Sequence, residues 1–482
     1  LEAPGRSAEW RKSARKPCTS EYFRVDFRAM DIIELLKRPE GKTLEFKRDL
    51  SSPAGTIKTI VAFANTAGGI VLIGVEDKSR RVRGVAKPME MEERLASLIS
   101  DHVTPRIVPE IEILPYGRTH VLALQVYPSP SRPHHIVRDG LEHGTYVRVG
   151  STNRKADSEL IAEMRRFAGG ETYDEQPLPN LDSEAIDFQA ASESFEPIRK
   201  LRKADLETLK LVTTYQGRKV PTVGGVLLFG RDREERFPDA WIQVGRFAGT
   251  DRRKISDRLQ IHSYPVNAID EAVSFVEKHS LQGAEIGRTR RKDTWNLPPL
   301  AVREAIVNAV AHADYSQRGA PIRLAIFDDR LEVESPGLLP FGLTVEDLHR
   351  GISKLRNRVI GRVFHALGLV EHWGSGIQRM TAACKDVGLA APLLEEIGTR
   401  FRVTISTVRL HPAILDETDR AILRFLERND GQVTSQIAKA IKLTPRATRT
   451  RLVKLVDRGL VQEVGTGPKD PTRRYFKIGK IE

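Results

Sequence analysis

The sequence predicts a mixed α/β protein built from several domains. Its 482 residues are too many for one hydrophobic core, and 40% of them are apolar, so two to four cores are expected. Helical and strand patterns alternate along most of the chain, which indicates α/β layers. From residue 412 onward the pattern changes to three helices followed by a hairpin.

The composition favours anionic partners. Lys and Arg number 77 against 64 acidic residues, which gives a formal net charge of +13. This balance is common among nucleic-acid-binding proteins, although a basic protein without such a partner can share it. The only two cysteines, Cys18 and Cys384, have no His or Cys neighbours at ligand spacing. Neither a disulfide framework nor a zinc site is therefore expected, which fits a reducing cytoplasm.

No membrane association is expected from the hydropathy pattern. The longest uncharged run, residues 59–75, is interrupted by Asn65 and three glycines, whereas a membrane span needs about 20 mostly apolar residues. Residues 1–29 mix charges of both signs without an apolar stretch. We expect them to form a flexible basic extension rather than a signal peptide.

The first domain is predicted to span residues 30–169. Its expected helices cover residues 31–37, 56–65 and 89–103, and its expected strands cover 43–47, 70–75, 110–114, 120–127 and 145–149. Asn65 and the pair Gly68-Gly69 should end a helix, where glycine also permits close approach of the backbone. Residues 170–187 are rich in Pro, Asp and Glu, the composition of a linker.

A second α/β domain is expected over residues 188–409. Strands are predicted at 225–229 and 241–247, followed by a long helix at 266–279. A basic stretch at 288–292 then precedes a helix that starts at Pro298 or Pro299, because proline suits the first helical turn.

Residues 412–482 predict a winged helix-turn-helix. A helix at 419–427 and a short helix at 435–441 precede Thr444, a good N-cap, and Pro445, which opens a helix over 446–458. The hairpin that follows has its tip, the wing, at 465–471. We expect DNA binding, with protein contacts as the alternative use of this fold, and a homodimer because many such regulators read paired half-sites. The residues expected to contact nucleic acid are Arg446, Arg449, Arg451, Lys454, Arg473 and Arg474.

Four short motifs mark the first domain. They are Glu45-Phe46-Lys47 and the stretches at 62–69, 74–77 and 146–151. Together they resemble the Schlafen Alba-like domain over residues 31–169. In Schlafen proteins that cleave RNA the site consists of three carboxylates, and the resemblance assigns these to Glu40, Glu45 and Asp77.

The implied site has a physical rationale. Clustered carboxylates repel one another unless a cation such as Mg²⁺ or Mn²⁺ is bound, and such an ion activates water against a phosphodiester, with Lys47 available to the phosphate. The alternation of Glu45 and Lys47 with Leu44 and Phe46 equally describes any half-exposed strand. Further basic residues would suit a nucleic-acid surface beside this site, or else a solvated face: Arg132, His134, His135, Arg138, Arg148 and Arg154.

The second domain contains a further set of motifs, at residues 297–315, 334–337 and 372–377. They resemble the C-terminal domain of proteins described as RecG-related helicases or transcriptional regulators, which is similar to the GHKL ATPases. The resemblance implies a general base at Glu304 and a Mg²⁺ ligand at Asn308, one helical turn apart. The residues expected to bind the cofactor ATP are Glu304, Asn308, His312, Gly337, Gly374 and Gly376.

The chain departs from the GHKL pattern where those proteins read adenine with an Asp, because Ser335-Pro336-Gly337 stands there. ATP binding is therefore expected with weak hydrolysis at most, and a purely structural role of these residues is the alternative. No Walker A sequence occurs, so a helicase motor is not expected. Two functions remain: a DNA-binding regulator whose middle domain senses a nucleotide or dimerises, and a metal-dependent nuclease that cuts RNA or DNA, with a role in defence.

Overall fold

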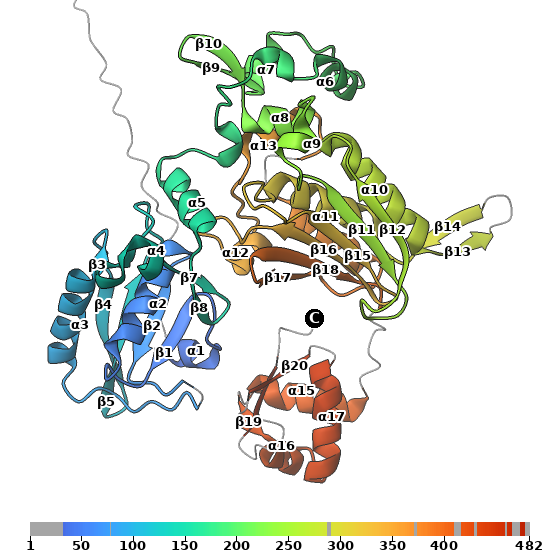
Figure 1. Cartoon of the computed structure of the whole chain (residues 1–482). Coiled ribbons are helices and arrows are strands. Elements are labelled where there is room, and N and C mark those ends of the chain that lie inside the picture. Colours follow the sequence, from blue (N-terminus) through green and yellow to red (C-terminus); the bar gives the residue numbers. More distant parts are fainter. Residues whose placement is uncertain are drawn as a thin grey trace, which may run out of the picture. The chain divides into compact units, whose positions relative to one another are not determined.

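The computed structural model describes residues 32–77, 79–286, 291–370, 374–408, 416–428, 431–457, 460–464 and 473–477 (Figure 1). Some of the expectations concern residues outside this part of the chain. They are the extension at 1–29, residues 372–373, part of the basic stretch at 288–292 and the wing tip at 465–471. The chain divides into two compact units, one that ends at Pro39 and one formed by residues 40–482. The first unit contains helix α1 (Ile32–Lys37), where a helix was predicted. Among the described residues, no helix has the length and apolar character needed to cross a bilayer.

The first domain is built on a four-stranded sheet with the strand order β1-β2-β5-β4. Its strands are β1 (Leu44–Lys47), β2 (Gly69–Ile73), β4 (Glu110–Tyr116) and β5 (Thr119–Val126). β1 and β2 are parallel, so a crossover must connect them, and helix α2 (Pro53–Asn65) provides it. Helix α3 (Pro88–His102) shares the core with α2.

The end of α2 confirms the role predicted for the glycines. The Gly68 N–H donates to the Phe63 carbonyl at 2.9 Å, and Gly68 has a φ of +76°. A Cβ at Gly68 would lie 2.7 Å from the Val126 carbonyl oxygen, so only glycine fits. Asn65 donates to the carbonyls of His134 and Tyr146 at 2.8 and 2.9 Å and thereby joins α2 to later parts of the domain.

Smaller elements complete this domain. They are the paired strands β3 (Val103–Thr104) and β6 (His135–Ile136), the hairpin β7 (Tyr146–Val149) and β8 (Thr152–Lys155), and the helices α4 (Gly140–Gly144) and α5 (Ser158–Ala168). The Asp157 side chain caps α5 by accepting the Leu160 N–H at 2.8 Å.

The second domain has a six-stranded sheet with the order β12-β11-β15-β16-β18-β17. Its strands are β11 (Ile242–Phe247), β12 (Ile255–Ile261), β15 (Ile322–Ile326), β16 (Arg330–Pro336), β17 (Leu393–Ile397) and β18 (Arg400–Ser406). Only β11 and β15 pair in parallel; the other four ladders are antiparallel. The strand predicted at 241–247 is thus confirmed as β11.

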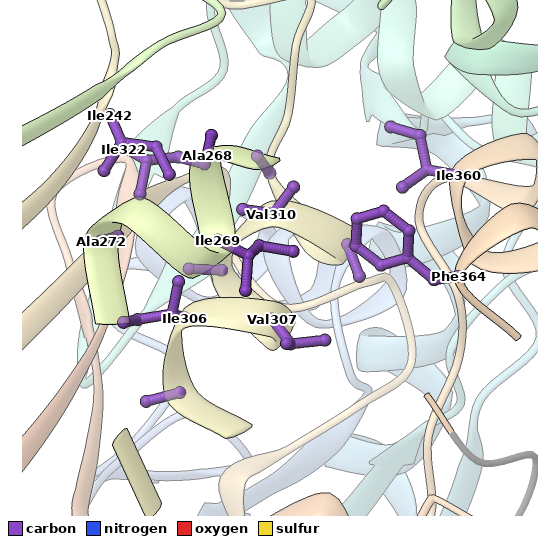
Figure 2. Packing of buried hydrophobic residues seen from close by; sticks show 14 of the residues in the cluster. Ile242, Ala268, Ile269, Ala272, Ile306, Val307, Val310, Ile322, Ile360 and Phe364 are labelled. Atoms are coloured by element: carbon purple, nitrogen blue, oxygen red, sulfur yellow. The ribbon is translucent and has the colours of Figure 1, made fainter. Parts of the chain in front are cut away.

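Helices pack on one face of this sheet. They are α10 (Pro265–Ser280), α11 (Pro299–His312), α13 (Arg358–Ala366) and α14 (Gly376–Asp386), and the first two confirm predicted helices. Figure 2 shows Ile306, Val307 and Val310 of α11 among residues of α10 and α13 and the strand residues Ile242 and Ile322. Helix α11 is therefore at the centre of the largest core.

The remaining elements of this domain are short. They comprise α6 (Phe188–Phe195), α7 (Asp205–Thr208), α9 (Arg233–Arg236), α12 (Val345–His349), the hairpin β9 (Val212–Tyr215) and β10 (Arg218–Pro221), and the pair β13 (Leu281–Ile286) and β14 (Arg291–Trp295).

The strand predicted at 225–229 is wrong. These residues belong to helix α8 (Val223–Phe229), all of which is buried. A short apolar run has no polar face that would reveal its period, so its pattern fits a buried strand and a buried helix equally. The Thr222 hydroxyl decides the local structure by accepting the Gly225 N–H at 3.0 Å as an N-cap.

The segment predicted as a linker contains a buried anchor. Asp174, in a short 3₁₀ turn, accepts the backbone N–H groups of Arg358, Val359 and Ile360 at 3.0, 2.7 and 3.0 Å. These are orphan donors at the start of α13, and a carboxylate is the natural partner for them. Burial raises the pKa of Asp174 to about 6 in spite of these hydrogen bonds. Part of the segment is thus fixed to the second domain.

The C-terminal domain is a winged helix-turn-helix. Its helices are α15 (Glu417–Arg428), α16 (Thr434–Ala440) and α17 (Pro445–Asp457), and its sheet has the order β19-β21-β20, with β19 (Gln432–Val433), β20 (Val461–Val464) and β21 (Arg474–Lys477). Ile422, Leu452 and Tyr475 are among the residues of its core. The Thr444 hydroxyl accepts the Ala447 N–H at 3.3 Å, which confirms the predicted cap.

Candidate nucleic-acid and nucleotide sites

Helix α17 presents a basic surface. Thr448, Leu452 and Leu455 are buried, and the opposite side of the helix is exposed. That exposed side comprises Arg446, Arg449, Thr450, Val453 and Lys454. Because α17 is the second helix of the helix-turn-helix, it occupies the position that enters the major groove in this class of domain.

The partners of Arg451, Arg473 and Arg474 lie inside this domain. Arg451 forms ion pairs with Asp416 at 2.5 Å and Asp419 at 2.7 Å, which attach α17 to the start of α15. Arg473 pairs with Glu463 at 2.6 Å. Arg474 is exposed, but its guanidinium also donates to the Gly431 carbonyl at 3.1 Å. Arg446, Arg449 and Lys454 are the predicted residues that lie on the exposed side of α17.

Sequence reasoning missed Thr450 and Val453. Both follow Arg446 at helical spacing, four and seven residues later, which places all three on one side of the helix. This spacing could have identified them from the sequence. Val453 has 43% of its surface exposed. An exposed apolar side chain on this helix has the chemistry to contact a thymine methyl group.

In the first domain, burial and, after it, interaction with the Asp77 side chain contribute to a raised pKa of Glu40. Glu40 also accepts the Phe46 N–H at 2.7 Å, which attaches it to β1. Burial raises the pKa of Glu40 to about 7 against the effect of that hydrogen bond, and the charges of Asp77 and Glu45 add to the rise. Asp77 itself is exposed, so the pair is accessible from the surface.

Glu45 has a different environment from the one predicted. Its carboxylate is 2.5 Å from the Arg148 guanidinium and also pairs with Lys47. Arg148 is 1% exposed and donates in addition to Gly41 and to Asn153, both at 2.9 Å. Two cations thus neutralise Glu45, and no group of three or more His, Cys, Asp or Glu in the described part of the chain is arranged as a metal site. The assignment of a metal to Glu40, Glu45 and Asp77 remains a prediction.

The basic surface suggested beside this site is partly wrong, because Arg132, His134 and Arg148 are buried. Arg132 donates to the carbonyls of Ala64 and Thr66 and lies over the ring of Phe167. Arg132 thus satisfies carbonyls that the end of α2 leaves without helical partners. Arg138 and Arg154 are exposed as expected.

In the second domain, Glu304 and Asn308 face the start of α14. A Cβ added at Gly376 would lie 2.8 Å from a Glu304 carboxylate oxygen and 3.3 Å from the Asn308 amide nitrogen. The structure therefore brings these three predicted residues together. Arg379 of α14, which the sequence analysis did not single out, donates to the Glu304 carboxylate at 2.9 Å.

The other predicted nucleotide residues have the following local environments. The His312 Nδ1 atom is buried without a hydrogen-bond partner, and burial, followed by the Arg356 charge, lowers the pKa of His312 to about 4, so the ring is neutral near pH 7. Gly337 has a φ of +99°, and a Cβ there would lie 2.9 Å from the Asp314 side chain. Gly374 has a φ of +65°, and a Cβ there would lie 2.7 Å from the Gly351 carbonyl. Both positions require glycine for the fold itself.

Three parts of the chain match known protein families. Residues 40–157 match the family Schlafen, AlbA_2, and residues 415–462 match the family of winged helix-turn-helix DNA-binding domains. Residues 319–405 match the family described as "Putative ATP-dependent DNA helicase recG C-terminal". These matches confirm the three kinds of domain and the mixed α/β class that the sequence predicted.

Two solved structures resemble the chain. A protein from Corynebacterium diphtheriae is 21% identical, with 88% of this chain and 91% of that chain covered and a TM-score of 0.43. The N-terminal domain of a RecG-related protein from Nitrosomonas europaea is 24% identical, with 26% of this chain and 94% of that chain covered and a TM-score of 0.22.

The raised pKa of Glu40 predicts a pH-dependent stability. An ordinary Glu loses its proton near pH 4.5, whereas folded Glu40 keeps it to about pH 7. The folded state therefore binds more protons between these values, and its stability falls as the pH rises through this window. A Glu40→Gln variant has no carboxyl group at this position and does not lose stability in this way. Its melting temperature should therefore rise relative to that of the wild type from pH 4.5 to 7.

Differential scanning fluorimetry across this pH range measures the effect. Glu93→Gln, at an exposed position of α3, is the matched control and should show a constant offset from the wild type. A constant offset for Glu40→Gln as well would contradict the prediction.

Proposed function

Because this chain combines a Schlafen AlbA_2 domain, a domain of the RecG C-terminal type and a winged helix-turn-helix, we propose that it is a DNA-binding transcriptional regulator with a nucleotide-binding middle domain. The observation that carries the proposal is the exposed side of α17, where cations and one apolar side chain occur together on a recognition helix. Homodimerisation is part of the proposal, since paired half-sites need two such helices.

The exposed residues of α17 divide into two chemical kinds. Arg446, Arg449 and Lys454 have the charge to contact phosphates or the acceptor edge of guanine. Thr450 and Val453 lie between them along the helix and suit base edges. Arg451 holds α17 against α15 through Asp416 and Asp419, so its role is to position the helix rather than to touch DNA.

The double variant Arg446→Ala/Lys454→Ala tests the DNA-binding proposal. It should weaken binding to duplex DNA at least about tenfold, because each lost base or phosphate contact costs about 1 kcal/mol or more. Fluorescence anisotropy with a labelled duplex measures the affinity. Arg420→Ala, which removes an exposed cation from α15, is the control and should bind as the wild type does. Equal binding by the double variant would reject α17 as the DNA-contacting helix.

We further propose that nucleotide binds where α11 meets α14. The backbone at Gly376 approaches Glu304 and Asn308 so closely that a Cβ would overlap the Glu304 carboxylate, and carboxylate and amide oxygens suit Mg²⁺. The N-terminus of α14 adds backbone N–H groups that favour phosphate. The Mg²⁺ would neutralise phosphate charge, with Asn308 as its expected ligand, while Arg379 already holds Glu304.

ATP with Mg²⁺ should raise the melting temperature of the wild type by at least about 5 °C at a hundredfold excess over the dissociation constant, since a ligand bound only by the folded state stabilises it. Asn308→Ala should abolish this shift by removing the metal ligand. Gln378→Ala, on the exposed side of α14, should retain it. A wild type that does not respond to ATP and Mg²⁺ would refute this site.

A nuclease is the second candidate function, and the Glu40–Asp77 pair favours it. A carboxyl group whose pKa is about 7 can donate or accept a proton at neutral pH, which is the requirement for a general acid or base. Because Glu45 is already neutralised by Arg148 and Lys47, the three-carboxylate donor set for Mg²⁺ or Mn²⁺ is not assembled among the described residues. The proposal therefore depends on proton transfer by Glu40 and Asp77.

Purified protein incubated with labelled RNA, single-stranded DNA and duplex DNA tests this function, with Mg²⁺ or Mn²⁺ and with EDTA. If the chain is a nuclease, Glu40→Gln and Asp77→Asn should reduce cleavage at least about 100-fold, the usual contribution of a general acid or base. The Arg446→Ala/Lys454→Ala variant should keep the activity on RNA. Intact substrates under every condition, or full cleavage by Glu40→Gln, would exclude this candidate.

A further inference from the structure

The six-stranded sheet of the second domain has a charged face. Side chains alternate between the faces of a strand, and Ile322, Leu324, Val333 and Val403 point into the core that the helices cover. Figure 1 shows α10 and α11 along that side. The residues between them in sequence therefore point to the other side of the sheet.

We call this other side the arginine face. Six arginines and four carboxylates belong to it by strand alternation or by direct contact: Arg252, Arg258, Arg323, Arg330, Arg400 and Arg402, with Asp329, Glu332, Glu334 and Glu395. The excess among these described residues is two positive charges within one face of a single sheet.

Three of the arginines neutralise the two central glutamates. Arg402 is 2.6 Å from Glu334, and Arg252 is 2.9 Å from Glu334 and 2.7 Å from Glu332. Arg330 also contacts Glu332 at 2.7 Å. Glu332 and Glu334 are each 5% exposed. Because both carboxylates are already paired, they add little stabilisation to any further cation nearby.

Arg323 and Arg400 remain without a carboxylate partner among the described residues. The cross-strand register places Arg323 opposite Glu334, yet Glu334 is held by Arg252 and Arg402, and the Arg323 Nε atom is buried without a hydrogen-bond partner. Arg400 donates to the Pro321 carbonyl at 2.9 Å. Burial, followed by the charge of Arg323, lowers the pKa of Arg400 against the opposing effect of the Glu334 charge. Within the part of the chain that the structure describes, no carboxylate forms an ion pair with either of these two arginines.

Uncompensated, partly buried guanidinium groups are costly unless an anion pairs with them. Guanidinium matches phosphate in shape as well as charge, because its planar N–H groups bind two oxygens at once. We propose that the arginine face binds the phosphodiester backbone of nucleic acid, as a contact surface in addition to α17. This inference rests on the proposed function, since it assigns a further surface to the same ligand.

The test uses the full chain and a labelled duplex of arbitrary sequence, with affinity measured from 50 to 200 mM salt. Arg323→Gln/Arg400→Gln should make the log–log salt slope shallower by about 1.8, because each lost phosphate contact removes about 0.9. The affinity lost over this salt range should then be about tenfold smaller than for the wild type.

The matched control is Arg362→Gln/Lys385→Gln, which removes the same charge from exposed positions of α13 and α14. It should keep the wild-type slope, and so should Arg323→Lys/Arg400→Lys, which preserves the charge. If the Gln variant does not fold, Arg258→Gln replaces it: this residue is exposed on the same face, and its loss should lower the slope by about 0.9.

An unchanged slope in the folded Gln variant overturns the inference. If Arg446→Ala/Lys454→Ala still weakens the same duplex, the proposed function survives that failure. Binding of polyglutamate that depends on Arg323 and Arg400, with an unchanged duplex slope, would assign the face to an acidic polypeptide and also overturn it. A wild type that binds no duplex at all overturns the inference and the proposed function together.

Discussion

The burial of helix α11 is the constraint on which the second domain depends. Its apolar side contacts the sheet and the neighbouring helices α10, α13 and α14 in one continuous core. This packing fixes the rotation of α11, and the rotation determines that Glu304 and Asn308 face Gly376. Loss of a side chain such as Ile306 would cost about 2–5 kcal/mol. Core packing therefore sets the positions of Glu304 and Asn308 in the candidate nucleotide site, and contacts among the polar residues contribute less to these positions.

Charge compensation explains why some cations are available to ligands and others are not. Arg148 and Arg451 each have carboxylate partners within their own domain. The Arg148–Glu45 pair is buried, and removing one partner of a buried pair is strongly destabilising. These arginines stabilise the fold. On the arginine face, cations outnumber the carboxylates among the described residues. The net charge of +13 alone does not identify this face; the local balance between each cation and its neighbours does.

The sequence predicted the domain types, most of the long helices and the shared face of Glu304 and Asn308, because these depend on local patterns and helical spacing. It failed at 225–229, where a fully buried helix has no polar side to reveal its period. It also failed for Arg132 and Arg148, whose burial depends on carbonyls and a carboxylate far away in the sequence. Arginine is usually exposed in folded proteins, so a sequence pattern predicts it at the surface. The partners that permit its burial become visible only in the tertiary structure.

The difference between sequence pattern and tertiary environment also affects the interpretation of Glu40 and Asp77. The sequence pattern grouped Glu45 with these carboxylates, but the fold gives Glu45 two cations and leaves Glu40 beside Asp77 in a partly buried setting. A carboxyl group that keeps its proton to about pH 7 differs chemically from a metal-bound carboxylate. Arg148 therefore separates the triad expected from sequence into the Glu45–Arg148 ion pair and the Glu40–Asp77 pair. Any chemistry in this domain depends on the proton that Glu40 retains, and that proton exists because burial disfavours its loss.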